Sequence, residues 1–234
     1  ISQLRFSVTS PPGTGILIDD VRIAPAVPQK IVSAVIVPLT LPALVGTDSS
    51  PLLKLKIETI GSRNPISLTE VKAAILSEVG DVVSAQAFWT AGTDQFTKTI
   101  PFGQVDRIAD SGQQQDAGRE PGKKGTVETT AVAFTGNQTL QEGKNYIWIA
   151  CKLAKDADIS HQVGAMCREV TFSDGGTLNV ESKPQIQRLG IALRQGGDDG
   201  VHTFRIPGLA TTNRGTLIGV YDVRHRSGGD LPGD

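Results

Sequence analysis

The chain has 234 residues, of which 38% are hydrophobic, and its formal net charge is −1. This length suffices for one large domain or two small domains with apolar cores. The balanced charge gives no reason to expect a nucleic-acid partner, and no apolar run approaches the roughly 20 residues that a membrane-spanning helix needs. The 26 glycines and 13 prolines, set between short apolar stretches, favour an all-β chain.

Residues 1–27 predict two strands, at 4–8 and 16–23. Two strands cannot bury a core by themselves. We therefore expect them to be the C-terminal strands of a preceding jelly-roll or carbohydrate-binding-like domain. Asp19 and Asp20 have two interpretations, a calcium contact or a solvated strand end, and the second is favoured.

Residues 28–183 carry repeated strand signals. Leu53, Leu55 and Ile57 alternate with charged residues, the pattern of a half-buried strand. The expected strands are residues 31–37, 53–57, 82–89, 126–134, 146–153 and 168–172. Turn chemistry is expected at residues 80–81, 91–93, 135–137 and 142–144, and an exposed, mobile loop at residues 104–124. Short strands at this spacing predict an antiparallel β-sandwich.

One segment of this region gives conflicting signals. Ser67 and Glu70 have the spacing of a helix capping box, and Leu68, Val71 and Ile75 have helical spacing. The segments on both sides predict strands, and tertiary context often overrides local propensity. We therefore expect a strand from residue 68 to residue 77.

Four residues of the predicted sandwich have two interpretations each. Cys151 and Cys167, the only cysteines, lie on consecutive predicted strands and form either a disulfide or two buried thiols. Isolated cysteines without clustered histidines do not predict a zinc site. Trp89 and Trp148 form either a sugar-stacking platform or part of the core, and their strand positions favour the core.

Residues 184–234 differ in character from the sandwich. Arg205 lies between two apolar residues, and a charged strand residue is rarely buried without a partner. It therefore reaches solvent or binds an anion. The expected elements are a short strand at residues 191–194, a loop at 195–200, the segment 201–209 and a strand at 216–223.

Arg224, Arg226 and Asp230 follow the last of these strands, where binding sites are commonly built. A guanidinium suits a carboxylate because it donates two parallel hydrogen bonds. An Arg205–Asp230 surface salt bridge is the structural alternative. Spacing alone does not distinguish this salt bridge from an anion-binding site.

Two stretches resemble a known family. The run Phe134-Thr135-Gly136-Asn137-Gln138-Thr139-Leu140-Gln141-Glu142-Gly143-Lys144-Asn145-Tyr146-Ile147-Trp148 resembles part of the N-terminal associated domain of bacterial BNR-repeat neuraminidases. Phe204-Arg205-Ile206-Pro207 resembles the Tyr/Phe-Arg-Ile-Pro signature that opens sialidase propellers. Gly215-Thr216-Leu217 and the Arg224-x5-Asp230 spacing also match that opening.

The resemblance implies an N-terminal piece of a bacterial exo-α-sialidase that is secreted, periplasmic or on the cell surface. Residues 184–234 would begin a six-bladed β-propeller that acts on sialylated glycans without a cofactor or metal. Arg205 would be the first arginine of the triad that binds the sialic acid carboxylate. Asp230 would be the general acid/base, and Arg224 would line the pocket near the sugar's 4-hydroxyl.

The resemblance also implies that these 234 residues lack part of the family's catalytic site. The family's nucleophilic tyrosine, its partner glutamate and two further triad arginines come later in the propeller, and neither Tyr146 nor Tyr221 fits the nucleophile. We expect the 234 residues alone to be inactive. Two alternatives remain open, namely a non-catalytic β-sandwich that binds a glycan or a partner at a cell surface, and a propeller hydrolase for another sugar. The sequence gives no oligomeric state.

Overall fold

The computed structural model describes residues 27–105, 127–180 and 182–229. Apart from a three-residue 3₁₀ turn, η1 (Asp198–Gly200), the regular structure of these residues is entirely β. The expected all-β class is therefore confirmed. The strands and Asp19–Asp20 pair predicted within residues 1–26, most of the predicted 104–124 loop, and Asp230 lie outside the described residues.

The first sheet has five strands in the order β1-β3-β8-β5-β6, all pairs antiparallel. Its strands are β1 (Lys30–Val37), β3 (Ser50–Ile60), β8 (Gly143–Leu153), β5 (Val82–Ala91) and β6 (Pro101–Val105). The predicted strands at 31–37, 53–57, 82–89 and 146–153 all fall within this sheet.

The second sheet has the order β2-β11-β9-β4-β7, with β10 paired to β9. Its strands are β2 (Ala43–Val45), β11 (Gln185–Ile191), β9 (Gln162–Phe172), β4 (Ser67–Glu78), β7 (Val127–Thr139) and β10 (Thr177–Asn179). β2 and β11 are parallel, so the expectation of purely antiparallel sheets is wrong at this edge. Long stretches of chain separate β2 from β11, and no local pattern encodes their pairing.

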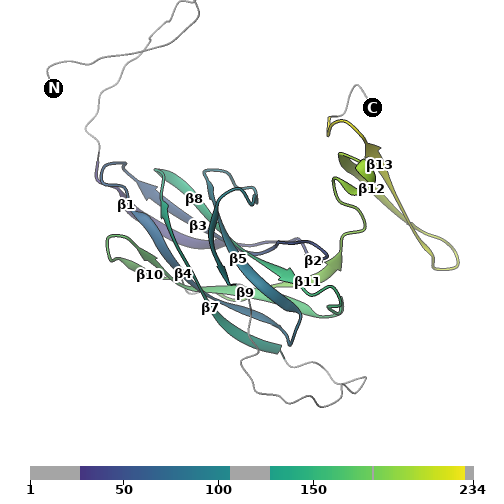
Figure 1. Ribbon diagram of the computed structural model, residues 1–234, viewed down its shortest axis with the longest axis horizontal. Coiled ribbons are helices and arrows are strands. Elements are labelled where there is room, and N and C mark those ends of the chain that lie inside the picture. Colours follow the sequence, from purple (N-terminus) through teal and green to yellow (C-terminus); the bar gives the residue numbers. More distant parts are fainter. Residues whose placement is uncertain (1–26, 106–126, 181, 230–234) are drawn as a thin grey trace, which may run out of the picture.

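The two sheets bury one apolar core between them, and together they form the two-sheet body (β1–β11; Figure 1). Leu53, Leu55 and Ile57 of β3 have no exposed surface, as the alternation of that strand predicted. Val71 of β4 contributes from the opposite sheet. Burial of such side chains is the main favourable contribution to folding.

The segment with conflicting signals is a strand, as expected. β4 is central in its sheet and pairs with β7 on one side and β9 on the other. Leu68, Val71 and Ile75 are almost completely buried there. A helix would leave the edges of both neighbouring strands without partners, so the sheet overrides the local helical spacing.

The predicted turn at residues 135–137 is wrong, because these residues continue β7. Gly136 is needed for close approach of β6 and not for a bend, since a Cβ at that position would collide with the backbone and ring of Phe102. Gly103 of β6 has the matching role, and its Cβ would lie 2.9 Å from the carbonyl oxygen of Thr135. Glycine inside a strand often marks such an approach of two backbones.

Cys151 on β8 and Cys167 on β9 are both buried and both free. They are consecutive in the sequence of strands but belong to different sheets. The structure thus supports two buried thiols and no disulfide. Burial raises the pKa of each thiol to about 12, which keeps both protonated and unreactive near neutral pH.

The strand expected at residues 191–194 is wrong in position, since β11 ends at Ile191. β12 (Thr203–Thr211) and β13 (Leu217–Arg224) follow and pair antiparallel as a two-stranded hairpin. Figure 1 shows this hairpin set apart from the two-sheet body. Within residues 182–229 the hairpin is not part of a larger sheet, and no propeller blade is formed there.

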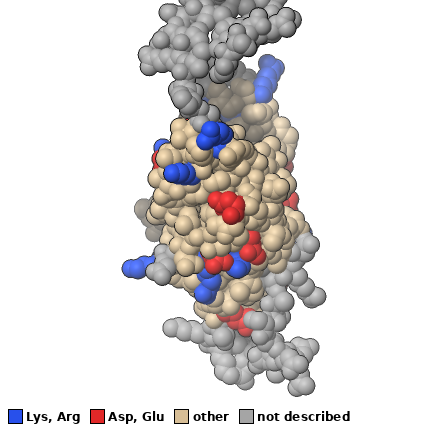
Figure 2. All heavy atoms as spheres, turned by 90° about the vertical axis from the view of Figure 1, so that its left-hand side faces the viewer, with Lys and Arg blue, Asp and Glu red and all other residues tan. Residues whose placement is uncertain are grey.

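The charged side chains of the two-sheet body are scattered. On the face shown in Figure 2, basic and acidic groups are intermixed, some singly and some side by side, among uncharged residues. No helix within the described ranges is long and apolar enough to cross a membrane.

Candidate functional site

Arg205 occupies an irregular position in the β12–β13 hairpin. It lies opposite Asp222 of β13, and the register shifts between Arg205 and Gly208. Ile206, between them, has a φ of 52°, which is costly for a β-branched residue. The Phe-Arg-Ile-Pro segment is therefore a bulged strand, and bulges commonly re-aim a side chain at a functional site.

Arg205 and Arg224 both donate hydrogen bonds to the same short loop, which follows β13. Nη1 of Arg205 donates to the carbonyl oxygen of Gly228 at 2.5 Å. Nη1 of Arg224 donates to the carbonyl oxygen of Gly229 at 2.7 Å, and its Nη2 donates to Asp222 at 3.0 Å. Two guanidinium groups thus hold successive carbonyls of the loop that leads to residue 230.

This arrangement has the chemistry of an anion site. Two positive charges beside one loop attract a carboxylate, and guanidinium groups bind carboxylates through charge-assisted hydrogen bonds. Asp222 partly balances the charge of Arg224. The structure therefore brings together two of the three predicted site residues, Arg205 and Arg224, while the third, Asp230, lies outside the described residues.

A second cluster on the same hairpin was not predicted from the sequence. Nε of Arg194 donates to the hydroxyl of Tyr221 at 3.2 Å, and its Nη1 pairs with Asp199 at 2.8 Å. The Tyr221 hydroxyl, followed by the charge of Asp199, raises the pKa of Arg194. The ring of Phe204 lies 5.3 Å from that of Tyr221, edge to face. The contacts join the 195–200 loop to the hairpin, and no sequence motif signals them.

The hairpin leaves large apolar side chains on its surface. Leu209 is 75% exposed and Leu217 is 65% exposed, and Ile206, Ile218, Val220 and Val223 are also exposed. Two-stranded hairpins are marginally stable by themselves, and contiguous exposed apolar surface is typical of an interface. The hairpin thus has the surface of a strand pair that packs against further structure.

The other candidates from the sequence lie in the two-sheet body. Trp89 is buried in the common core, as favoured. Trp148 is also buried, but in a small cluster with Phe88, Tyr146 and Ala150 on the outer side of the first sheet. No group of three or more His, Cys, Asp or Glu within the described ranges is placed to hold a metal ion.

Comparison with known proteins gives the family. Residues 31–176 match the N-terminal domain of BNR-repeat neuraminidase. The chain belongs to this family. The match includes the Phe134 to Trp148 run that resembles this family, and the expected family is thereby confirmed.

The chain is homologous to bacterial sialidases. It is 44% identical over 103 residues to a sialidase of Bacteroides fragilis (strain YCH46), a match that covers 43% of this chain and 19% of that protein. The solved structure of Hadza microbial sialidase Hz136 matches with a TM-score of 0.54 and 24% identity, over 84% of this chain and 39% of that chain. At that identity the second match supports the fold alone. The chain spans less than two thirds of either relative.

Proposed function

We propose that this chain is part of a bacterial exo-α-sialidase that removes terminal sialic acids from glycoconjugates with retention of configuration. The observation that carries the proposal is the convergence of Arg205 and Arg224 on the Gly228–Gly229 loop. The convergence occurs in a chain of the BNR-repeat neuraminidase family. An anionic sugar needs cationic partners, and the ends of β12 and β13 supply two beside this loop.

In the proposed site Arg205 binds the sialic acid carboxylate and Arg224 lines the pocket near the 4-hydroxyl. Asp230 protonates the glycosidic oxygen and then activates water, which requires a shielded site that raises its pKa. The sugar's anomeric carbon already bears a carboxylate, so a neutral phenol approaches it more easily than a second carboxylate does. The nucleophile is then a tyrosine other than Tyr146 and Tyr221.

We also propose the domain order and location that go with this activity. Residues 1–27 close a preceding carbohydrate-binding-like domain, residues 28–183 form the associated β-sandwich, and residues 184–234 begin a six-bladed propeller. The exposed apolar side chains of Leu209 and Leu217 support the last assignment, because neighbouring strands of a blade would cover them. The protein is secreted, periplasmic or on the cell surface.

The test is release of a fluorophore from a 4-methylumbelliferyl sialoside. The 234-residue chain should give no release above buffer, whereas the complete gene product should turn the sialoside over and leave the matching galactoside intact. Release by the 234 residues would contradict the proposal that they carry only part of the catalytic site. A downstream sequence without two further arginines and a tyrosine would favour a propeller hydrolase for another sugar.

A second candidate is a non-catalytic module that binds glycan through the two-sheet body. Trp148 favours it, because its ring lies at the wall of a cavity in this body. Binding of residues 28–183 to a glycan array would support that role. The two functions are compatible within one protein.

A further inference from the structure

The Arg194 cluster, which consists of Arg194, Asp199, Phe204 and Tyr221, joins the segment after β11, the turn η1 and the hairpin. Arg194 follows β11, Asp199 belongs to η1, and the two aromatic residues belong to β12 and β13. Nε of Arg194 donates to the hydroxyl of Tyr221 at 3.2 Å, and its Nη1 donates to Asp199 at 2.8 Å. One guanidinium group therefore ties the connection from the two-sheet body to the second strand of the hairpin.

Phe204 is held in the same cluster by its ring. The ring lies edge to face with that of Tyr221, with centroids 5.3 Å apart, and the guanidinium carbon of Arg194 lies 6.0 Å from its centre. Both arrangements are favourable for an aromatic ring. Tyr221 presents its hydroxyl to Arg194 and its ring to Phe204, so it links the guanidinium to the first strand of the hairpin.

Arg205 is the next residue, and it lies on the other face of β12. Successive side chains of a strand point to opposite faces. Phe204 is opposite Val223 in the strand register, whereas Arg205 is opposite Asp222, the partner of Arg224. The Arg194 cluster thus occupies the face of the hairpin behind the two arginines, and it anchors the residue immediately before Arg205.

The backbone at Arg205 needs such an anchor. The register shifts between Arg205 and Gly208, and Ile206 has a φ of 52°, in the left-handed region that a β-branched residue rarely adopts. A strained bulge persists only when its surroundings hold it, and within residues 182–229 β12 has one neighbouring strand. The carbonyl of Gly228 holds the Arg205 guanidinium from one face, and the Arg194 cluster holds the backbone from the other.

We propose that Tyr221 and Arg194 are positioning residues that hold Arg205 in the conformation that binds the sialic acid carboxylate. This inference rests on the proposed sialidase function, and it gives Tyr221 a role in the site other than that of the nucleophile. Tyr221 acts through the ring of Phe204, and Arg194 acts through Tyr221, so neither residue need contact the sugar. A guanidinium that donates two parallel hydrogen bonds tolerates little misorientation, and loss of the anchor therefore weakens carboxylate binding.

Steady-state kinetics of the complete protein on a 4-methylumbelliferyl sialoside test the proposal. Tyr221→Phe removes only the hydroxyl that accepts from Arg194, and Arg194→Met removes the donor. Each substitution should lower kcat/KM about fivefold. The loss should arise mainly from a higher KM, because Arg205 binds the carboxylate in the ground state as well as in the transition state.

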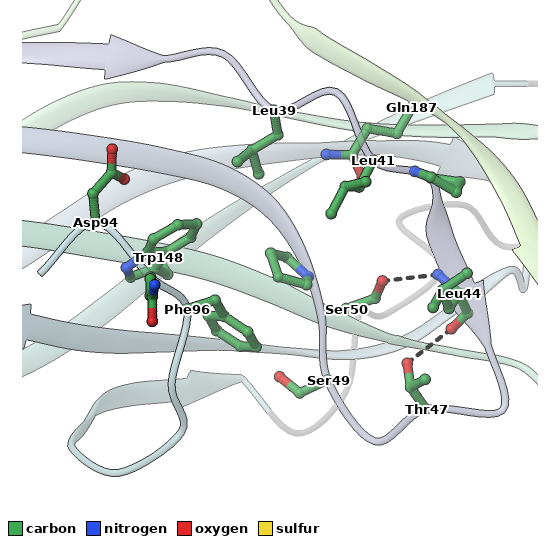
Figure 3. Close-up of a pocket in the computed structure, with 13 residues that line it drawn as sticks. Leu39, Leu41, Leu44, Thr47, Ser49, Ser50, Asp94, Phe96, Trp148 and Gln187 are labelled. Carbon is green, nitrogen blue, oxygen red and sulfur yellow. Dashed lines mark hydrogen bonds between the residues drawn. The ribbon is translucent and has the colours of Figure 1, made fainter. Parts of the chain in front are cut away.

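Each variant has a matched control. Tyr146→Phe removes the same atom from the other tyrosine of the chain. Tyr146 packs in one cluster of the two-sheet body with Trp148, whose ring lies at the wall of the cavity shown in Figure 3. Arg214→Met makes the same change as Arg194→Met in the exposed turn between β12 and β13. Both controls should keep the kcat and KM of the parent.

A double-mutant cycle separates positioning from a general structural role. If Tyr221 acts through Arg205, Tyr221→Phe should lower kcat/KM by less than about twofold in an Arg205→Ala background, because the contact that it orients is already absent. An equal loss in both backgrounds would overturn the proposal. The kinetics of the parent in both Tyr221→Phe and Arg194→Met would also overturn it.

Hydrogen exchange of the complete protein separates failure of this inference from failure of the proposed function. In Tyr221→Phe and Arg194→Met the amides of β12 should exchange about fivefold faster, while those of β4 in the two-sheet body should be unchanged. If the parent turns over no sialoside, the proposed function fails, and exchange alone decides whether the Arg194 cluster holds Arg205. Unchanged exchange in β12 would overturn the inference in either case.

Discussion

Arg205 and Arg224 lie on paired strands and donate hydrogen bonds to the carbonyl oxygens of neighbouring glycines, Gly228 and Gly229. Each guanidinium therefore fixes one peptide of the loop as well as its own position. The loop leads directly to Asp230, so the two arginines would fix the backbone immediately before that residue.

The position of Arg224 leads to the first prediction. In the complete protein, Arg224→Met should raise the KM for a fluorogenic sialoside about tenfold or more, because in the proposed site it removes a charged donor to the sugar. The effect on kcat should be smaller, since the contact exists in the ground state as well. Arg214→Met, in the exposed turn between β12 and β13, is the control and should leave both constants unchanged.

The two buried cysteines lead to the second prediction. With a pKa of about 12, neither Cys151 nor Cys167 should react with Ellman's reagent at pH 8 in the folded chain, and both should react in denaturant. Thiols in the unfolded chain lose their protons near the ordinary pKa of 9.0, whereas the folded chain retains them. The contribution of the two thiols to the free energy of unfolding is therefore fully present below pH 9. It should be lost as the pH rises from 9 towards 12. Fast reaction of one thiol without denaturant would show that its strand is not buried as described.

Gln29 leads to the third prediction, because it joins two segments of the body. Its Oε1 accepts from the amide of Ile66 at 2.6 Å, and its Nε2 donates to the carbonyl of Leu140 at 3.1 Å. Gln29→Leu leaves the buried amide of Ile66 without this acceptor and should lower the free energy of unfolding by about 2 kcal/mol. Urea denaturation measures the change. Gln162→Leu, at an exposed position of β9, should change it by less than about 0.5 kcal/mol.

The close approach of β6 and β7 leads to the fourth prediction. Gly136→Ala should destabilise the body by about 1–3 kcal/mol, because the added methyl group meets Phe102 of the neighbouring strand. Gly103→Ala should act similarly through Thr135. Gly190→Ala on β11 is the control, since its Cβ would come no closer than 3.5 Å to Leu44 and Pro42. Equal thermal unfolding of all three variants would mean that the two strands do not approach closely.

Local sequence patterns predicted the strands that are long and regular. The alternation of Leu53, Leu55 and Ile57 identified β3 because one face of that strand meets the common core. The strand β4 was identified correctly only by giving its neighbours more weight than its own helical spacing. The pattern failed at Gly136, where the same residue type that makes turns was instead required by a neighbouring backbone.

Long-range pairing was beyond the reach of the sequence. The parallel β2–β11 pair joins segments separated by most of the body, and three-residue strands such as β2 carry no periodicity. Arg205 and Arg224 were predicted as site residues because a short motif and its spacing resemble those of a known family. The contact of Arg194 with Tyr221 was missed, because it depends on which segments the fold brings side by side.

The central claim is that Arg205 binds the carboxylate of a sialic acid, and one measurement tests it most directly. The kcat/KM of the complete protein is measured on a 4-methylumbelliferyl sialoside for the parent, for Arg205→Ala and for the control Arg214→Ala. We predict turnover by the parent and the control, and a loss of at least about 100-fold for Arg205→Ala, since a charged hydrogen-bonding partner is removed. Turnover by Arg205→Ala at the parent's rate, or no sialoside turnover by the complete protein, would contradict it.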